Sequence, residues 1–151
     1  VRLYGVVLGS SGEVDLGATE ERRKSMRTER MRVARTPRRS IEGKLSVDAA
    51  PQVTEWVSLV ADRGELFFAC ASCGKTLGPA EVGYRQGCLE LEIALDTISP
   101  NFLSPKAEIN EDVVFRRFLC PGCGRPLDGQ VCRPSDVPYN DVMVDGKAEL
   151  P

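Results

Sequence analysis

The sequence predicts a mainly β fold of short antiparallel strands, built around two cysteine turns and preceded by a strand and a helix. Two turns share the pattern Cys-x-x-Cys-Gly-basic-x-Leu, at residues 70–77 and 120–127. A short segment rich in β-branched and aromatic residues leads into each turn. Two such turns, each delivered by a strand, are typical of a zinc-ribbon-like domain.

Length and composition limit the possible functions. The chain has 151 residues, a net charge of −2, and no apolar run long enough to span a membrane. No charged-then-apolar secretory pattern opens it, and we expect a cytoplasmic protein. It begins with Val1 rather than Met, which we interpret as a fragment or the end of a longer polypeptide.

The chain contains no histidine. This excludes a Ser-His or Cys-His nucleophilic pair, a histidine metal ligand and an imidazole acid or base within these residues. We therefore assign no catalytic residue and no residue that binds an organic cofactor.

Charge divides the chain near residue 40. Residues 1–39 contain ten Arg and Lys and five Asp and Glu. Residues 40–151 contain ten Arg and Lys and seventeen Asp and Glu. The two parts therefore carry +5 and −7. We predict a strand and basic helix over residues 1–35, a linker over 36–45, and a metal-binding domain over 46–151.

The first part is expected to contain a strand over residues 2–8 and a helix from about 16 to 33, capped by Asp15. The helix and the residues after it are rich in arginine. One interpretation is a nucleic-acid-binding zinc ribbon that uses this basic helix. No aromatic residue alternates with the arginines, and glutamates lie among them, so a solvated or partner-docking helix is favoured.

The rest of the chain alternates strands and turns. Residues 89, 91, 93 and 95 are apolar and alternate with Glu90 and Glu92, which predicts a strand with an apolar face and a solvent face. Residues 96–110 are expected to form a loop. The predicted strands are 53–60, 65–69, 88–95, 113–119, 127–133 and, as a short last one, 141–144.

Cys70, Cys73, Cys120 and Cys123 are the predicted metal ligands. A Cys-x-x-Cys turn brings two sulfurs to one metal, and the following glycine can take the positive φ that curls the backbone beneath them. Lys75 and Arg125 are expected to offset the negative charge of four thiolates. With every position a thiolate, no site is open for water or substrate, and the metal is predicted to be structural.

The metal and the remaining cysteines leave alternatives open. Zn²⁺ is the default, and iron in a rubredoxin-like site competes with it because spacing does not separate the two metals. Disulfides and a redox dithiol are less compatible with duplicated turns that follow strands. Cys88 and Cys132 lack a Cys-x-x-Cys partner, and we interpret both as buried small apolar residues.

Residues 53–145 resemble the gamma-subunit family of acetone carboxylase, which supplies the zinc subunit of acetone and acetophenone carboxylases. The resemblance rests on Cys-x-x-Cys-Gly-x-x-Leu-Gly-Pro-Ala at 70–80 and Tyr-Arg-Gln-Gly at 84–87. It continues with Phe-Arg-Arg-Phe-Leu-Cys-Pro-Gly-Cys-Gly at 115–124 and a Pro-x-Asp-x-Pro stretch with a late Asp at 134–141.

The first 30 or so residues have a separate resemblance. Tyr-Gly-Val-Val-Leu at 4–8, Val-Asp at 14–15 and Ala-Thr-Glu at 18–20 are similar to the C-terminal tail of hydantoinase B/oxoprolinase family subunits. Together the two resemblances imply a non-catalytic zinc module in a carboxylase or hydantoinase complex, with hydantoinase-A-like and hydantoinase-B-like subunits as partners. The whole complex would perform ATP-dependent carboxylation of a ketone or hydrolysis of a cyclic amide.

Overall fold

The computed structural model describes residues 4–98, 101 and 104–144, and the fold is mainly β as predicted. One antiparallel sheet has the order β1-β2-β3-β4, formed by Gln52–Thr54, Val57–Asp62, Glu65–Cys70 and Thr76–Pro79. The second has the order β5-β6-β7, formed by Leu89–Ala94, Val114–Leu119 and Pro126–Cys132. The helices are α1 Leu16–Val33, η1 Arg85–Gly87, α2 Leu95–Ile98 and α3 Pro105–Ile109. No helix of the described residues is both long and apolar enough to cross a membrane.

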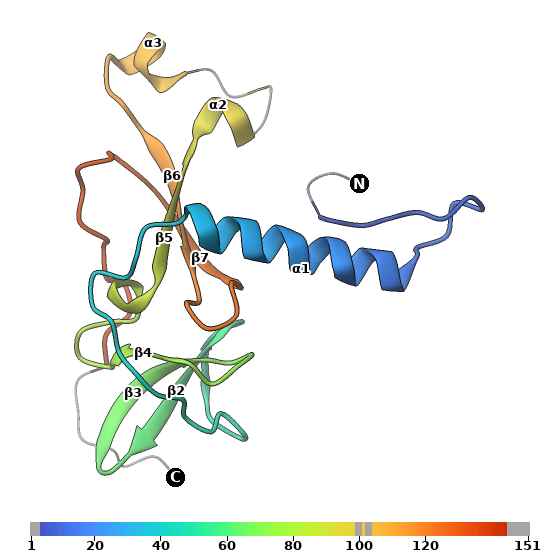
Figure 1. Cartoon of the computed structure of the whole chain (residues 1–151). Coiled ribbons are helices and arrows are strands. Elements are labelled where there is room, and N and C mark those ends of the chain that lie inside the picture. Colours follow the sequence, from blue (N-terminus) through green and yellow to red (C-terminus); the bar gives the residue numbers. More distant parts are fainter. Residues whose placement is uncertain (1–3, 99–100, 102–103, 145–151) are drawn as a thin grey trace.

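The two sheets form a body from which α1 projects to one side (Figure 1). Asp15 caps α1 as predicted, its carboxylate accepting from the Ala18 N–H. Residues 4–14 run back along the helix, where the Val7 N–H donates to Thr19 Oγ1 and the Asp15 N–H donates to Val7 O. The strand predicted at 2–8 is wrong for residues 4–8, which form only an isolated bridge between Leu8 and Val14, and residues 2 and 3 lie outside the described part.

The remaining predicted strands are mostly present. The segment 53–60 is not one strand: a turn at Glu55 and Trp56 divides it into β1 and β2, and the Trp56 N–H donates to Thr54 Oγ1. β4 was not expected, because Gly78 and Pro79 signal a break. Gly78 is required there, since a Cβ would lie 2.7 Å from Gly83 O.

The segments around the last β-rich stretch also differ from expectation. Residues 141–144 form no strand, although the Val144 N–H donates to Ala80 O. Within 96–110, predicted as a loop, the structure places α3 and most of α2.

The hydrophobic core lies where the two sheets meet. Phe68 and Tyr84 pack edge to face with their ring centroids 5.6 Å apart, and Cys88 is fully buried beside them, as predicted. Cys132 is also buried. Both sheets contribute to this core, which includes Val57, Phe68, Cys70, Leu77, Phe118, Cys120 and Leu127.

The stretch over 36–45 runs along both sheets (Figure 1). It begins after a bridge between Arg35 and Glu90 on β5, continues with a hydrogen bond from the Arg39 N–H to Gln86 O, and ends with one from the Leu45 N–H to Gly74 O. This segment, which we call the strap, therefore fixes the distance between α1 and the first cysteine turn.

The strap covers a polar face of β5 that we expected to face solvent. That expectation is wrong for Glu90, which is 2% exposed. Its carboxylate lies 2.6 Å from Arg38 Nε and 3.5 Å from Nε of the fully buried Arg116. Arg116 also bonds to Glu92 and to Asp136 O. A buried charge is tolerated only when it is paired in this way, so the sheet and its covering segments depend on one another.

Replacing Arg116 tests this dependence. Arg116→Met leaves Glu90 and Glu92 without their shared cation and is expected to lower the free energy of unfolding by about 3–5 kcal/mol. Arg133→Met is the matched control, because Arg133 is exposed and its ion pair is with the half-exposed Glu111. This substitution should cost less than about 1 kcal/mol. Urea denaturation measures both, and equal losses would contradict the proposed role of the buried pair.

A second buried network joins η1 to β7. Arg85 is 5% exposed, and its guanidinium contacts Asp128 and Asp141 while lying over the Phe118 ring. The Tyr84 hydroxyl donates to Asp128 Oδ2 at 2.7 Å. Burial and this hydrogen bond raise the pKa of Tyr84 above its ordinary value.

The raised pKa predicts a loss of stability at alkaline pH. Since the unfolded chain releases the tyrosine proton first, the stability that Tyr84 contributes is complete below about pH 10 and is lost as the pH rises further. Tyr84→Phe cannot ionise, and its free energy of unfolding should fall less steeply above that pH, by up to about 1.4 kcal/mol per pH unit. Tyr139→Phe, at an exposed position, should decline like the parent protein. Urea titrations at each pH measure this, and identical slopes for both variants would refute it.

Candidate metal centre

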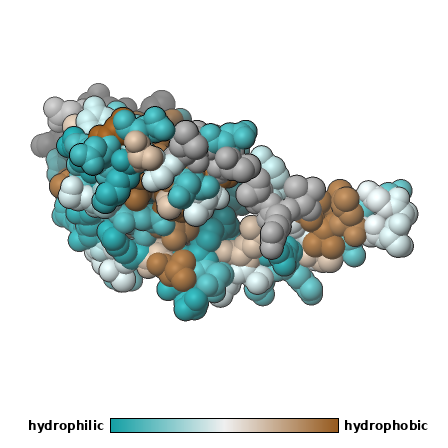
Figure 2. Space-filling view, turned by 90° about the horizontal axis from the view of Figure 1, so that it is seen from above, coloured by the Kyte–Doolittle hydropathy of each residue, from teal (hydrophilic) through white to brown (hydrophobic). Residues whose placement is uncertain are grey.

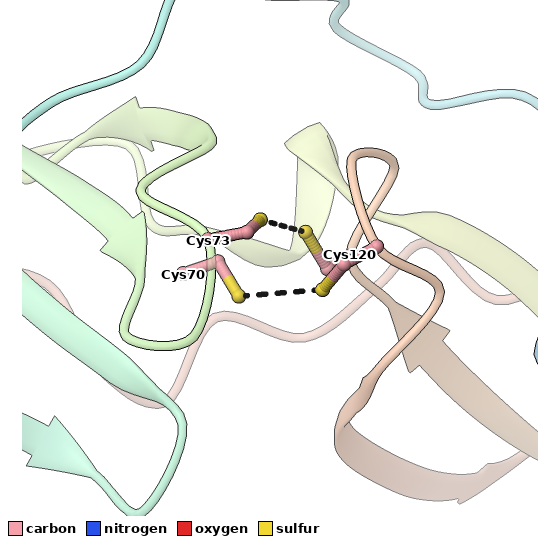
Figure 3. A group of neighbouring side chains, drawn as sticks. Cys70, Cys73 and Cys120 are labelled. Atoms are coloured by element: carbon pink, nitrogen blue, oxygen red, sulfur yellow. Dashed lines mark hydrogen bonds between the residues drawn. The ribbon is translucent and has the colours of Figure 1, made fainter. Parts of the chain in front are cut away.

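The four predicted ligands meet between the two sheets. Cys70 and Cys73 belong to the turn between β3 and β4, and Cys120 and Cys123 belong to the turn between β6 and β7. All four Sγ atoms lie within 4.8 Å of one another. The pairs that face each other across the site are Cys70 and Cys123, 3.9 Å apart, and Cys73 and Cys120, 3.6 Å apart (Figure 3).

The two turns are built alike. In the first, the Cys70 N–H donates to Lys75 O and the Gly74 N–H donates to Cys70 O. In the second, the equivalent bonds join Cys120 to Arg125 and Gly124 to Cys120. The repeated sequence pattern is therefore a repeated backbone conformation.

The glycine of each turn has two functions. Gly74 and Gly124 have φ values of +71° and +67°, as predicted. They also admit neighbouring segments: a Cβ would lie 2.4 Å from Leu45 O at Gly74 and 2.7 Å from Met31 Sδ at Gly124. The strap thus packs on the first cysteine turn, and α1 packs on the second. The spacing of the cysteines in the sequence could not show these contacts.

The sulfur positions fit a four-coordinate metal ion. A tetrahedral site with a Zn–S bond of about 2.3 Å has its sulfurs about 3.8 Å apart. The two measured separations, 3.6 and 3.9 Å, lie on either side of this value. A disulfide needs about 2.05 Å, and all six cysteines are free thiols in this structure.

The clustered thiols lose their first proton easily. Hydrogen bonds from Cys120 and Cys123 lower the pKa of Cys70 to about 3, and the same contacts raise the pKa of Cys120. The Gly122 N–H also points at Cys120 Sγ, at 3.3 Å. Like charges this close repel each other, so full deprotonation requires a cation between the sulfurs.

Lys75 and Arg125, expected to offset the thiolate charge, are held by other groups. Lys75 Nζ donates to Ile41 O at 2.7 Å, and the Arg125 guanidinium lies 3.8 Å from the centre of the Trp56 ring. Within the described residues neither cation donates to a sulfur. They also tie the strap, and the turn between β1 and β2, to the two cysteine turns.

The other two cysteines do not belong to the cluster. Cys88 Sγ donates to Tyr84 O, and burial raises the pKa of its thiol. Burial also raises the pKa of Cys132. Neither cysteine is a metal ligand in this arrangement, and a raised pKa makes a thiol a poor nucleophile at neutral pH.

Comparison of the sequence with models of known protein families gives no match, and a search of curated proteins gives no match either. The metal centre is therefore assigned from its own geometry. Four thiolates fill a tetrahedral shell, which leaves no position for water or substrate and is typical of a structural site.

Loss of one ligand should release the metal and destabilise the fold. Cys73→Ser or Cys120→Ser is expected to lower the metal content well below one ion per chain and the melting temperature by about 10 °C or more, because metal binding is coupled to folding. Cys132→Ala changes a cysteine outside the cluster and should keep the metal. Elemental analysis and calorimetry measure both effects, and an unchanged melting temperature in the metal-free protein would contradict a structural role.

Proposed function

We propose that this chain is a non-catalytic, structural zinc-binding domain or subunit that supports assembly of an ATP-dependent carboxylase of the acetone or acetophenone type, or of a hydantoinase/oxoprolinase-type complex. The observation that carries the structural role is the closed four-thiolate site between the two sheets. Zinc is the proposed ion because structural four-cysteine sites between short β-hairpins are its most common setting.

The position of the site supports a structural role. Each cysteine turn is the tip of a hairpin from a different sheet, so one ion would join the two halves of the body. The chain lacks a histidine, and no carboxylate of the described residues belongs to the thiol cluster. A metal held in this way contributes free energy of folding rather than a reactive water.

The proposed partners follow from the resemblance of residues 53–145 to carboxylase gamma subunits and of the first 30 or so residues to hydantoinase-B-like tails. The projecting arm, residues 4–14 with the start of α1, offers a surface for such contacts. Figure 2 shows apolar side chains near its far end. Leu16 is 80% exposed, and Leu8 and Val14 are about half exposed, which is unusual for clustered apolar residues unless a partner covers them.

The alternative of a nucleic-acid-binding zinc ribbon finds less support. Much of the positive charge around α1 is already paired with carboxylates inside the protein. The pairs are Arg27 with Glu20, Arg32 with Glu29, Arg35 with Glu92 and Arg38 with Glu90. Paired arginines are poor phosphate ligands, since a phosphate would have to displace each carboxylate.

Co-expression tests the proposed assembly. With hydantoinase-A-like and hydantoinase-B-like subunits from the same source, the chain should elute in one complex that contains one zinc per chain. Leu16→Glu should weaken the complex by about tenfold or more, because it places a charge on the arm, while glutamate at the first position of a helix remains compatible with folding. Met143→Glu, also at an exposed apolar position, is the control.

Two results would contradict the proposal. Elution of the chain alone, with its metal bound, would reject the partners but keep the metal centre. A coloured protein containing iron would reject zinc and favour the rubredoxin-like alternative.

A further inference from the structure

A basic cleft lies between α1 and the two cysteine turns, and no part of the proposed function uses it. Its volume is about 590 Å³, within the range of sites for small ligands. Helix α1 forms one wall and the metal turns form the other. The lining residues are Tyr4, Glu20, Arg23, Met26, Arg27, Arg30, Ser72, Cys123, Arg125 and Pro126.

Arg30 is the unusual residue of this cleft. It is partly buried, and its Nε is fully buried without a hydrogen-bond acceptor among the described residues. Burial and the nearby cations Arg117 and Arg27 lower its pKa, so its surroundings disfavour its charge. A buried donor without an acceptor costs about 1–3 kcal/mol, more when it is charged. Because Arg30 also lines the cleft, an anion there would offset the unfavourable burial of its charge.

The other arginines leave donors available to the same anion. The Arg125 guanidinium lies over Trp56 and has no carboxylate partner among the described residues. The hydrogen bond that the structure shows for Arg23 is from Nε to Tyr4 O. Among the described residues, Arg27 alone of these arginines forms an ion pair, with Glu20 at 2.7 Å. Several guanidinium groups thus face one cleft with a single carboxylate among them.

These charges exceed what the metal centre can balance. The four arginines that line the cleft and Glu20 give a formal charge of +3. A divalent ion with four thiolates would contribute −2, and Arg117, close to Arg30, adds one positive charge. The cleft therefore remains cationic with the metal bound.

We propose that this cleft binds the oxyanion group, phosphate or carboxylate, of a small ligand, with Arg30 as the central residue. The planar guanidinium presents two parallel N–H donors that match the oxygens of such a group. A ligand here would contact α1 and the second cysteine turn together. Its binding would therefore stabilise the docking of the helix on the metal centre.

A long polyanion fits this surface less well. The other side of α1 carries Glu21, Lys24 and Glu29, so it offers no continuous positive surface for a nucleic-acid backbone that would wrap around the helix. Among the described residues that line the cleft, the one aromatic residue is Tyr4, at 72% exposure, and it offers no enclosed surface on which bases could stack.

The chain contains its own reporter for this site. Trp56 is the only tryptophan, and the Arg125 guanidinium lies 3.8 Å from its ring centre. An oxyanion that draws Arg125 toward the cleft should change the tryptophan fluorescence. The metal-loaded protein is titrated at constant ionic strength with inorganic phosphate, pyrophosphate and citrate, and separately with a single-stranded oligonucleotide.

Two arginine variants distinguish specific anion binding in the cleft from nonspecific attraction by positive charge. Arg30→Gln is expected to weaken binding of the best small anion by about tenfold or more, the loss of one charge-assisted hydrogen bond. Arg32→Gln removes the same charge from the same helix but at an exposed position paired with Glu29, and should change the affinity by less than about twofold. Metal content and circular dichroism are recorded for both variants to verify folding.

The outcomes are distinct. Saturable binding of phosphate, pyrophosphate or citrate that depends on Arg30 but not on Arg32 supports the site, and the preferred probe identifies phosphate or carboxylate chemistry. Equal losses of affinity in both variants overturn the proposal. So does the absence of binding up to about 10 mM, a concentration at which a site with a millimolar dissociation constant would be filled. Tight oligonucleotide binding that small anions do not displace also overturns it, in favour of a nucleic-acid surface.

Discussion

The close approach of four thiols is the constraint on which the rest of the structure depends. Sulfurs within 4.8 Å of one another cannot all be ionised unless a cation lies between them. The two hairpins that present them belong to different sheets, so the site also determines how those sheets meet. Phe68 and Phe118 lie on the strands that lead into the two cysteine turns and belong to the same buried cluster as Cys70 and Cys120, which links metal binding to burial of apolar surface.

The segments outside the hairpins are positioned by the same turns. The strap contacts Gly74 through Leu45, and α1 contacts Gly124 through Met31. In both places a glycine provides the space, because any side chain would collide with the neighbouring segment. The positive φ of each glycine bends the turn around the metal, and the missing Cβ admits a neighbour. A conformation required by the metal thus also organises the surface around it.

The arginine side chains of this protein have two kinds of surroundings: some form ion pairs inside the fold, and others line one open cleft. Arg116 and Arg85 are buried and paired with carboxylates and carbonyl oxygens, and they connect β6 and η1 to distant parts of the chain. Arg30 differs from them because it forms no ion pair with a carboxylate among the described residues, and like Arg116 it has a buried Nε without a hydrogen-bond acceptor there. Helix α1 is joined to the body near its C-terminal end, where Met31 contacts Gly124 and the following Arg35 bridges to Glu90, while most of its residues are exposed.

The sequence by itself determined which four cysteines come together, the helix from Leu16 to Val33 with its Asp15 cap, and most of the strands. These features depend on local spacing and on residues close in the chain. Only the tertiary structure decided the burial of Glu90, the division of 53–60 at Trp56, the strand at Thr76–Pro79 and the path of the strap. The burial of Glu90 and the path of the strap depend on contacts with segments far away in the sequence, whereas the division at Trp56 and the strand at Thr76–Pro79 depend on pairing with the neighbouring hairpin strand. Alternation along β5 placed Glu90 toward solvent, and it is buried because Arg116 and Arg38 come from other elements to pair with it.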